Sequence, residues 1–216
     1  TRDTLIDGGA GNDLAIIQRS STTTAITFSI ANPSTTQTFD STTLRGIERI
    51  QYTGGSGIDT ITGGALGDIL NGEAGNDVLR AGAGSDSVSG GDGNDQLFGD
   101  GGNDSLNGGA GTDTIDGGDD SDTMDGGLGA DSLSGGAGHD SITSRSEADG
   151  LRDTLIDGGA GIDFANIDRL AATVAVTLSG ANTYTGTTTV SAGTLTLGHA
   201  TNTLADTSAL VVNGGT

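Results

Sequence analysis

The sequence predicts an all-β solenoid built from short, nearly identical coils. A nine-residue unit repeats ten times between residues 54 and 143 without an insertion. Every unit has an aspartate at its sixth position and an aliphatic or Met side chain at its eighth. Each unit therefore carries one charged side chain and one side chain that is suited to burial. A fixed period of this kind is typical of repeat architectures. Helical periodicity is not convincing anywhere, which leaves strands and turns as the elements.

The unit follows the template Gly-Gly-x-Gly-x-Asp-x-U-x, where U is apolar. Its six-residue glycine-rich part predicts a tight turn, because glycine accepts positive φ and brings backbone carbonyls close together. The last three residues predict a short strand with only the middle side chain facing inward. Two units then form one coil, and successive coils stack at about 4.8 Å. The inward residues are Ile61, Leu70, Leu79, Val88, Leu97, Leu106, Ile115, Met124, Leu133 and Ile142.

Stacking arranges the sixth-position aspartates in two rows, one on each edge of the solenoid. One row holds Asp59, Asp77, Asp95, Asp113 and Asp131, and the other holds Asp68, Asp86, Asp104, Asp122 and Asp140. Carboxylates at this spacing repel one another unless a cation lies between them. Carboxylate and carbonyl oxygens in a flexible cage favour Ca²⁺ over Mg²⁺. Four gaps in each row predict about eight calcium ions, which nearly neutralise the net charge of -21.

A second, longer duplication frames the nonapeptides. Residues 2–13 (RDTLIDGGAGND) return almost unchanged at 152–163 (RDTLIDGGAGID), an offset of 150 residues. We expect the chain to be an internal piece of a longer tandem array. The predicted modules are degenerate solenoid coils with one glycine-aspartate turn at 1–53, the nonapeptide array at 54–143, a polar insertion at 144–157, and the start of a second large repeat at 158–216.

The nonapeptides, with the turns that begin at Gly8 and Gly158, resemble the calcium-binding repeats of the RTX (repeats-in-toxin) family, whose consensus is GGxGxDxUx. The resemblance implies a parallel β-roll in which the aspartates of both rows, together with Asp13 and Asp163, bind calcium beside carbonyls of the turn. It also implies secretion by a Gram-negative bacterium and folding triggered by extracellular calcium.

Residues 180–216, which include GANTYTGTTTVSAGTLTLG, resemble the strand repeat of autotransporter passenger domains. That resemblance implies a right-handed parallel β-helix continuing the same solenoid axis. No calcium-ligand pattern occurs in this part of the sequence.

Several functional classes are excluded by composition. The chain has no cysteine and no lysine, so it has neither a thiolate metal site nor a P-loop lysine. Without a basic patch, nucleic acid is not an expected partner. No apolar run is long enough to span a membrane. An EF-hand fails because Met124 follows Asp120 and Asp122 where a ligand is needed. Disorder remains the alternative in the absence of calcium, since the chain is acidic and poor in apolar residues.

Two functions remain. The first is a calcium-stiffened structural segment of a large secreted or cell-surface adhesin, filament or matrix protein, with self-association or surface and matrix ligands as candidate partners. The alternative is a secretion and folding module attached to a secreted enzyme or toxin. The chain itself is not predicted to be an enzyme, because calcium ligands in a saturated cage are poor acids or bases and neither histidine has a nucleophilic partner. The duplication favours the first function, because tandem enlargement extends reach.

The template has five departures, namely Leu66, Glu73, Ala81, Asp100 and Asp120 in place of glycine. Four of them fall in the row that contains Asp68 and Asp122. We therefore expect this row to bind calcium more weakly than the other.

Overall fold

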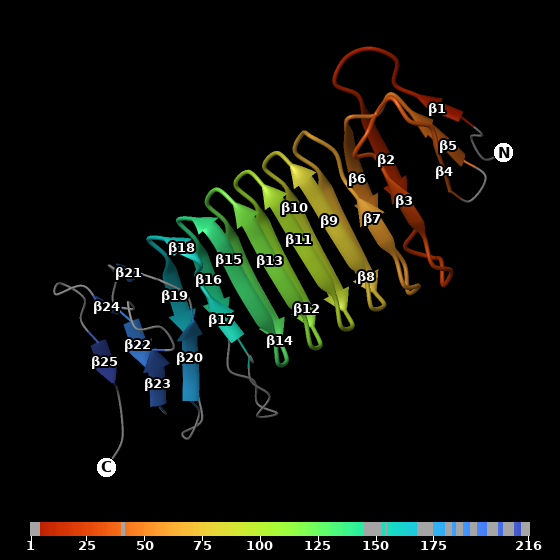
Figure 1. Cartoon of the computed structure of the whole chain (residues 1–216). Coiled ribbons are helices and arrows are strands. Elements are labelled where there is room, and N and C mark those ends of the chain that lie inside the picture. The colour runs from red at the N-terminus through yellow and green to blue at the C-terminus, as the bar shows by residue number, and fades with distance from the viewer. Residues whose placement is uncertain are drawn as a thin grey trace.

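The computed structural model describes residues 5–39, 42–144, 153 and 155–167, and the backbone of short strands between residues 175 and 212. Every regular element among them is a β-strand, and almost all strands pair in parallel (Figure 1). The predicted all-β parallel solenoid is confirmed. In the described part of the chain, no helix is long and apolar enough to cross a membrane. Most of residues 180–216 lies outside the described residues.

Two parallel sheets form the solenoid, and the chain alternates between them from one strand to the next. The first sheet contains β2 (Leu14–Gln18), β6 (Arg49–Thr53), β8 (Ile69–Ala74), β10 (Ser87–Asp92), β12 (Ser105–Ala110), β14 (Thr123–Leu128), β16 (Ser141–Ser144) and β19 (Phe164–Ile167). The second contains β3 (Thr27–Ser29), β7 (Thr60–Thr62), β9 (Val78–Ala83), β11 (Gln96–Gly101), β13 (Thr114–Asp119), β15 (Ser132–Gly138), β17 (Leu155–Asp157), β20 (Ala175–Ser179) and β23 (Thr194–Leu197), with β18 (Ala160–Gly161) beside β15.

The pairing register places identical unit positions on top of one another. In the first sheet, Val88 pairs with both Leu70 and Leu106, one coil before and one coil after it. All ten inward side chains are at most 2% exposed, so they form the continuous core that the eighth position predicts. Each coil supplies only two such side chains, and the core is therefore thin.

The strands are longer than the sequence pattern suggests. In the regular coils each strand runs for six residues and includes the two glycines that open the next unit, as in β10 and β12. The turn itself shrinks to positions four to six. Positive φ at positions two and four, for example 110° at Gly91 and 133° at Gly93, bends the chain without ending the pairing. Our expectation of a three-residue strand and a six-residue turn was therefore wrong.

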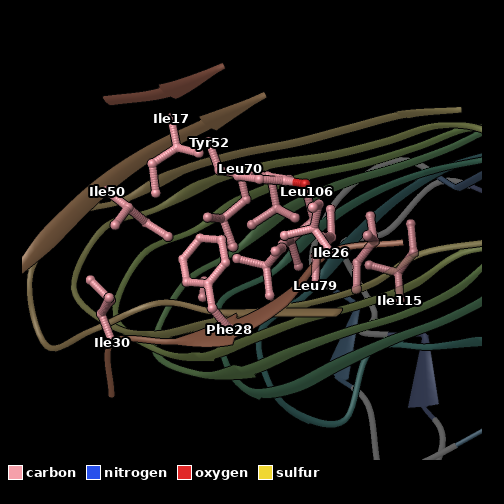
Figure 2. Close-up of a cluster of buried hydrophobic side chains, with 14 of the residues drawn as sticks. Ile17, Ile26, Phe28, Ile30, Ile50, Tyr52, Leu70, Leu79, Leu106 and Ile115 are labelled. Carbon is pink, nitrogen blue, oxygen red and sulfur yellow. The ribbon is translucent and has the colours of Figure 1, made fainter. Parts of the chain in front are cut away.

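The N-terminal end of the solenoid has a small additional sheet. It contains β1 (Leu5–Asp7), β5 (Thr42–Arg45) and β4 (Gln37–Phe39), and only the pair β4 and β5 is antiparallel (Figure 1). The adjoining coils have a larger core than the nonapeptides, because aromatic and isoleucine side chains gather there (Figure 2). The rings of Phe28 and Tyr52 meet edge to face at 5.6 Å between centroids.

Towards the C-terminus the backbone continues as parallel pairs. β21 (Thr183–Tyr184) pairs with β24 (Thr203–Leu204), and β22 (Thr188–Val190) pairs with β25 (Leu210–Val212). The proposed module boundaries at residues 53, 143 and 157 remain a prediction, although the sheets themselves run without interruption from the nonapeptides into β17 and β19.

Candidate metal centres

The sixth-position aspartates form two buried ladders, one at the start of the strands of each sheet. All ten side chains, from Asp59 to Asp140, are at most 4% exposed. Buried carboxylates on this scale are rare unless they are paired or coordinate a metal. The ladders lie on the rows that the sequence predicts, because each aspartate stands two residues before a core side chain and so shares its stacking register.

One oxygen of each carboxylate is fixed by the neighbouring coil. The backbone N–H of Asp77 donates to Oδ1 of Asp95 at 2.7 Å, and that of Asp95 donates to Oδ1 of Asp113 at 2.8 Å. The other row repeats the pattern, with Asp86 donating to Asp104 at 2.9 Å. Every one of these bonds joins residues 18 positions apart, so it forms only when two adjacent coils are stacked in register.

The second oxygen has a different environment. Among the described residues, no group hydrogen-bonds to the buried Oδ2 atoms of Asp13, Asp77, Asp86, Asp95, Asp104, Asp113, Asp122, Asp140 and Asp163. A buried acceptor without a donor is costly, and the same cost recurs in coil after coil. The repetition indicates that the fold leaves these oxygens for a ligand.

Glycine at the first position lets a backbone carbonyl of the next coil and the Oδ2 atom of the same unit's aspartate approach one spot. A Cβ on Gly108 would lie 2.4 Å from Oδ2 of Asp113 and 2.5 Å from the carbonyl oxygen of Gly126, in the next coil. Likewise, a Cβ on Gly72 would lie 2.2 Å from Oδ2 of Asp77 and 2.6 Å from the carbonyl oxygen of Gly90. A larger side chain would obstruct this approach, and among the ten nonapeptides only the unit of Ala81 has a residue other than glycine at this position.

Burial without a counter-charge shifts the ionisation of the ladders. Desolvation raises the pKa to about 7 at Asp77 and Asp104 and to about 6 at Asp86, Asp113 and Asp122, and carboxylates in adjacent coils add to the increase. Burial likewise raises the pKa of Asp68, Asp95, Asp131, Asp140 and Asp163. Ionised ladders therefore need a cation nearby.

The atoms that could coordinate a cation between coils are all oxygens. Carboxylate Oδ2 atoms and turn carbonyls are the ligands that Ca²⁺ prefers, whereas softer metals need nitrogen or sulfur. In the part of the chain that the structure describes, no group of three or more His, Cys, Asp or Glu side chains is placed so that it could hold a metal ion by itself. The backbone would therefore supply most of the ligands, which fits the glycine-rich turns.

The first member of each row differs from those that follow. Oδ2 of Asp59 accepts a hydrogen bond from the Tyr52 hydroxyl at 2.8 Å, and Oδ2 of Asp68 accepts one from the backbone N–H of Gly64 at 2.7 Å. Burial and the neighbouring Asp59 raise the pKa of Tyr52, so its hydroxyl stays protonated and donates. The role of Asp59 and Asp68 as calcium ligands remains a prediction, with protein donors already at the second oxygen.

Both ladders extend past residue 143. The backbone N–H of Asp140 donates to Oδ1 of Asp163 at 3.0 Å, and that of Asp131 donates to Oδ1 of Asp153 at 3.1 Å. The turn motif at Gly158 indicated Asp163. Sequence reasoning missed Asp153, because it follows Asp131 by 22 residues and no nine-residue frame surrounds it. At the other end, Asp13 belongs to a turn of the same type, and its N–H donates to Glu48.

Comparison with protein-family models agrees with this geometry. Overlapping matches to the RTX calcium-binding nonapeptide repeat (4 copies) cover residues 53–88, 63–97, 81–115, 89–124 and 116–151. The passenger-associated-transport-repeat matches residues 175–197. A comparison with curated proteins gives no match. The chain therefore carries RTX calcium-binding nonapeptide repeats through its central part, followed by a passenger-associated repeat.

Membership of this repeat class makes the segment a calcium-binding one. The RTX repeats themselves are structural rather than catalytic. His139 is an exposed residue of the turn before Asp140, and its Nδ1 accepts a hydrogen bond from the backbone N–H of Ile162 at 3.0 Å. His199 lies outside the described residues.

Proposed function

We propose that this chain is a calcium-stiffened structural segment of a large secreted or cell-surface protein of a Gram-negative bacterium, such as an adhesin, filament or matrix component. The observation that carries the proposal is the row of buried Oδ2 atoms that meet carbonyl oxygens of the next coil without a donor among the described residues. Family matches to RTX and passenger-associated repeats support secretion, because both repeat classes are associated with exported proteins.

The sixth-position aspartates, with Asp13 and Asp163, are the proposed carboxylate ligands. Calcium, when bound, supplies the positive charge that joins adjacent coils. The aspartate Oδ1 atoms set the spacing by accepting backbone N–H groups, while first-position glycines keep the carbonyls accessible. Four gaps in each row of the nonapeptides correspond to about eight ions. Without them the stacked carboxylates repel, so folding and calcium binding are coupled.

An extended structural role is favoured over a secretion module by the way in which the second large repeat joins the first. β17 pairs with β15, and β19 pairs with β16, so the duplicated sequence continues the same two sheets. Both aspartate rows also continue across the join. A module needed only for export gains nothing from such continuity, whereas a stiff spacer gains length. The alternative would be favoured by a catalytic domain adjoining this segment in the parent protein.

Circular dichroism during a calcium titration tests the proposal. We expect the β signal to increase cooperatively with calcium and to weaken on chelation, with a much weaker response to Mg²⁺, which demands a smaller octahedral site. An equal response to both cations, or a β signal that does not change with calcium, would remove the idea. Small-angle scattering of the calcium-loaded protein then measures its length and shape, and tests whether the segment is a rigid rod.

A further inference from the structure

The 150-residue duplication places one sequence in two different environments. In its second copy, strand β17 lies between β15 and β20, and Ile156 is 3% exposed. In its first copy, the same Leu-Ile-Asp sequence forms β1, which among the described strands pairs with β5 alone, at the edge of the small N-terminal sheet. Ile6 is correspondingly only partly buried. The second copy thus shows the first copy's sequence packed against a preceding nonapeptide coil.

The first copy already has the backbone shape that such packing requires. Gly9 has a φ of 87° and Gly11 of 138°, while the equivalent Gly159 and Gly161 have 80° and 148°. These matching values show that turn 8–13 takes the docked conformation although no described coil precedes it. The turn is therefore preformed.

The space that a preceding coil would fill is open. A Cβ on Gly159 would collide with the carbonyl oxygen of Gly136 at 1.9 Å, and one on Gly161 with that of Gly138 at 1.5 Å. A Cβ on Gly9 would meet nothing within 4 Å. The turn at 8–13 thus lacks the carbonyls that cover its counterpart.

The main chain beside the turn points its hydrogen-bonding groups into the same space. In the second copy, the backbone N–H of Phe164 donates to the carbonyl oxygen of Asp140 at 2.7 Å, and β19 pairs with β16. Leu14 is the equivalent of Phe164, and its strand β2 is the last described strand of the first sheet, with β6 as its neighbour. Asp13 adds a buried Oδ2 that lacks a hydrogen-bond donor among the described residues.

We propose that turn 8–13 and strand β2 form a docking site for the last nonapeptide coil, residues 132–144, of another copy of this array placed upstream. On docking, β2 pairs with the upstream β16, and β1 leaves β5 to take the place that β17 has in the second copy. β1 is held to β5 by a three-residue pairing, by a hydrogen bond from the backbone N–H of Gly8 to the carbonyl oxygen of Arg45 at 3.0 Å, and by the ion pair between Asp7 and Arg45, while Ile6 packs against the core. The ion pair is exposed and contributes little, and pairing with the upstream β15, as β17 pairs in the second copy, would replace the backbone bonds that β1 gives up. The two sheets then continue from one large repeat into the next. This extends the proposed function and rests on it.

Disulfide trapping tests the join, since the chain has no cysteine of its own. The test protein places residues 1–150 in front of the complete chain, with Ser141→Cys in the upstream copy and Leu14→Cys in the downstream copy. The matched control is the 216-residue chain without the added copy. It carries Ser141→Cys and Phe164→Cys, two positions that are in register in the structure. Neighbouring strands hold such pairs within the Cα distance that a disulfide spans.

With calcium present, the tandem pair should cross-link with a yield within about twofold of the control, because both pairs have the same geometry. Ile17→Cys in place of Leu14→Cys should give little product, since this side chain faces the core. A control that cross-links while the tandem pair does not, or an equal yield from the Ile17 variant, overturns the docking proposal. Failure of both pairs together with an absent calcium response in circular dichroism would instead reject the proposed function.

Discussion

Asp77 and Asp95 occupy the same position in consecutive coils, and the backbone N–H of Asp77 holds Oδ1 of Asp95 at 2.7 Å. The second oxygen of Asp95 is buried and has no donor among the described residues. One carboxylate therefore has two separable roles. Its first oxygen fixes the stacking of the coils and is satisfied by protein, whereas its second provides charge for a cation.

Asp95→Asn separates these roles, because the amide oxygen can still accept the bond from Asp77 while the charge is lost. We expect calcium affinity at this step to fall at least about tenfold, as expected for loss of a ligand. In EDTA the variant should be as stable as the parent or more stable, because a buried uncompensated charge is removed. Calorimetric titration and urea unfolding measure the two effects.

Asp119→Asn is the matched control, since Asp119 is exposed and loses the same charge outside the ladder. It should leave both the calcium affinity and the stability in EDTA nearly unchanged. Equal effects of the two substitutions would show that general repulsion, rather than the buried ladder, controls calcium binding.

The pH dependence should reverse between the calcium-free and the loaded state. The folded pKa values of about 7 at Asp77 and Asp104 exceed the ordinary 3.8, so the folded chain holds more protons than the unfolded chain between these values. Without calcium, stability is therefore greatest near and below the ordinary pKa and declines as the pH rises through about 6 to 7. With calcium, acidification should destabilise the fold, because protons displace the ion.

Thermal unfolding between about pH 4 and pH 8, with EDTA and with calcium, measures both trends. A stability that rises with pH in EDTA would contradict the assignment of raised pKa values to these carboxylates. The Asp95→Asn variant should show a smaller dependence in both series, because burial raises the pKa of Asp95 as well.

Glu73 occupies a glycine position of the template with a φ of 72°, a conformation that disfavours side chains. Glu73→Gly should stabilise the protein by about 1 kcal/mol, since it relieves this left-handed strain. Asp92→Gly is the control, because it removes the same charge from a residue without positive φ and should cost about 0.5 to 1 kcal/mol. Unfolding midpoints that shift in the same direction for both variants would contradict the explanation.

The row of Asp68, Asp86, Asp104, Asp122 and Asp140 should bind calcium more weakly than the other row. Ala81 illustrates the reason, since it stands at a first position where other units have glycine beside Oδ2 of the aspartate. Ala81→Gly should raise calcium affinity in this row while lowering stability in EDTA by about 0.5 to 1 kcal/mol. Ala83→Gly, at an exposed third position, should lower stability without any gain in affinity.

Anomalous scattering from calcium-loaded crystals gives the occupancy of each gap directly. Equal occupancy and equal ligand geometry in both rows would refute the asymmetry, whatever the behaviour of the glycine variants.

The two ladders and the core could be predicted because one side chain in each unit carries each role. The nine-residue period alone is enough to predict that Asp95 lies in a ladder and that Leu97 lies in the core. The long strands could not be predicted, because glycines such as Gly91 pair only once a neighbouring coil supplies the partner. Asp153 was missed for a related reason: its place in the ladder depends on β17 resuming the sheet after a break in the period.

The hydrogen bond between Tyr52 and Asp59 leads us to expect that folding starts at the N-terminal coils. At this end the hydroxyl of Tyr52 is the partner of an aspartate Oδ2 atom, whereas metal ions are the proposed partners of the Oδ2 atoms further along. A cluster of aromatic and isoleucine side chains also holds the surrounding strands together. The N-terminal coils consequently close without waiting for an ion at the second oxygen of Asp59, and they present a finished template to the next turn. We expect the calcium concentration to govern elongation from this seed rather than its formation.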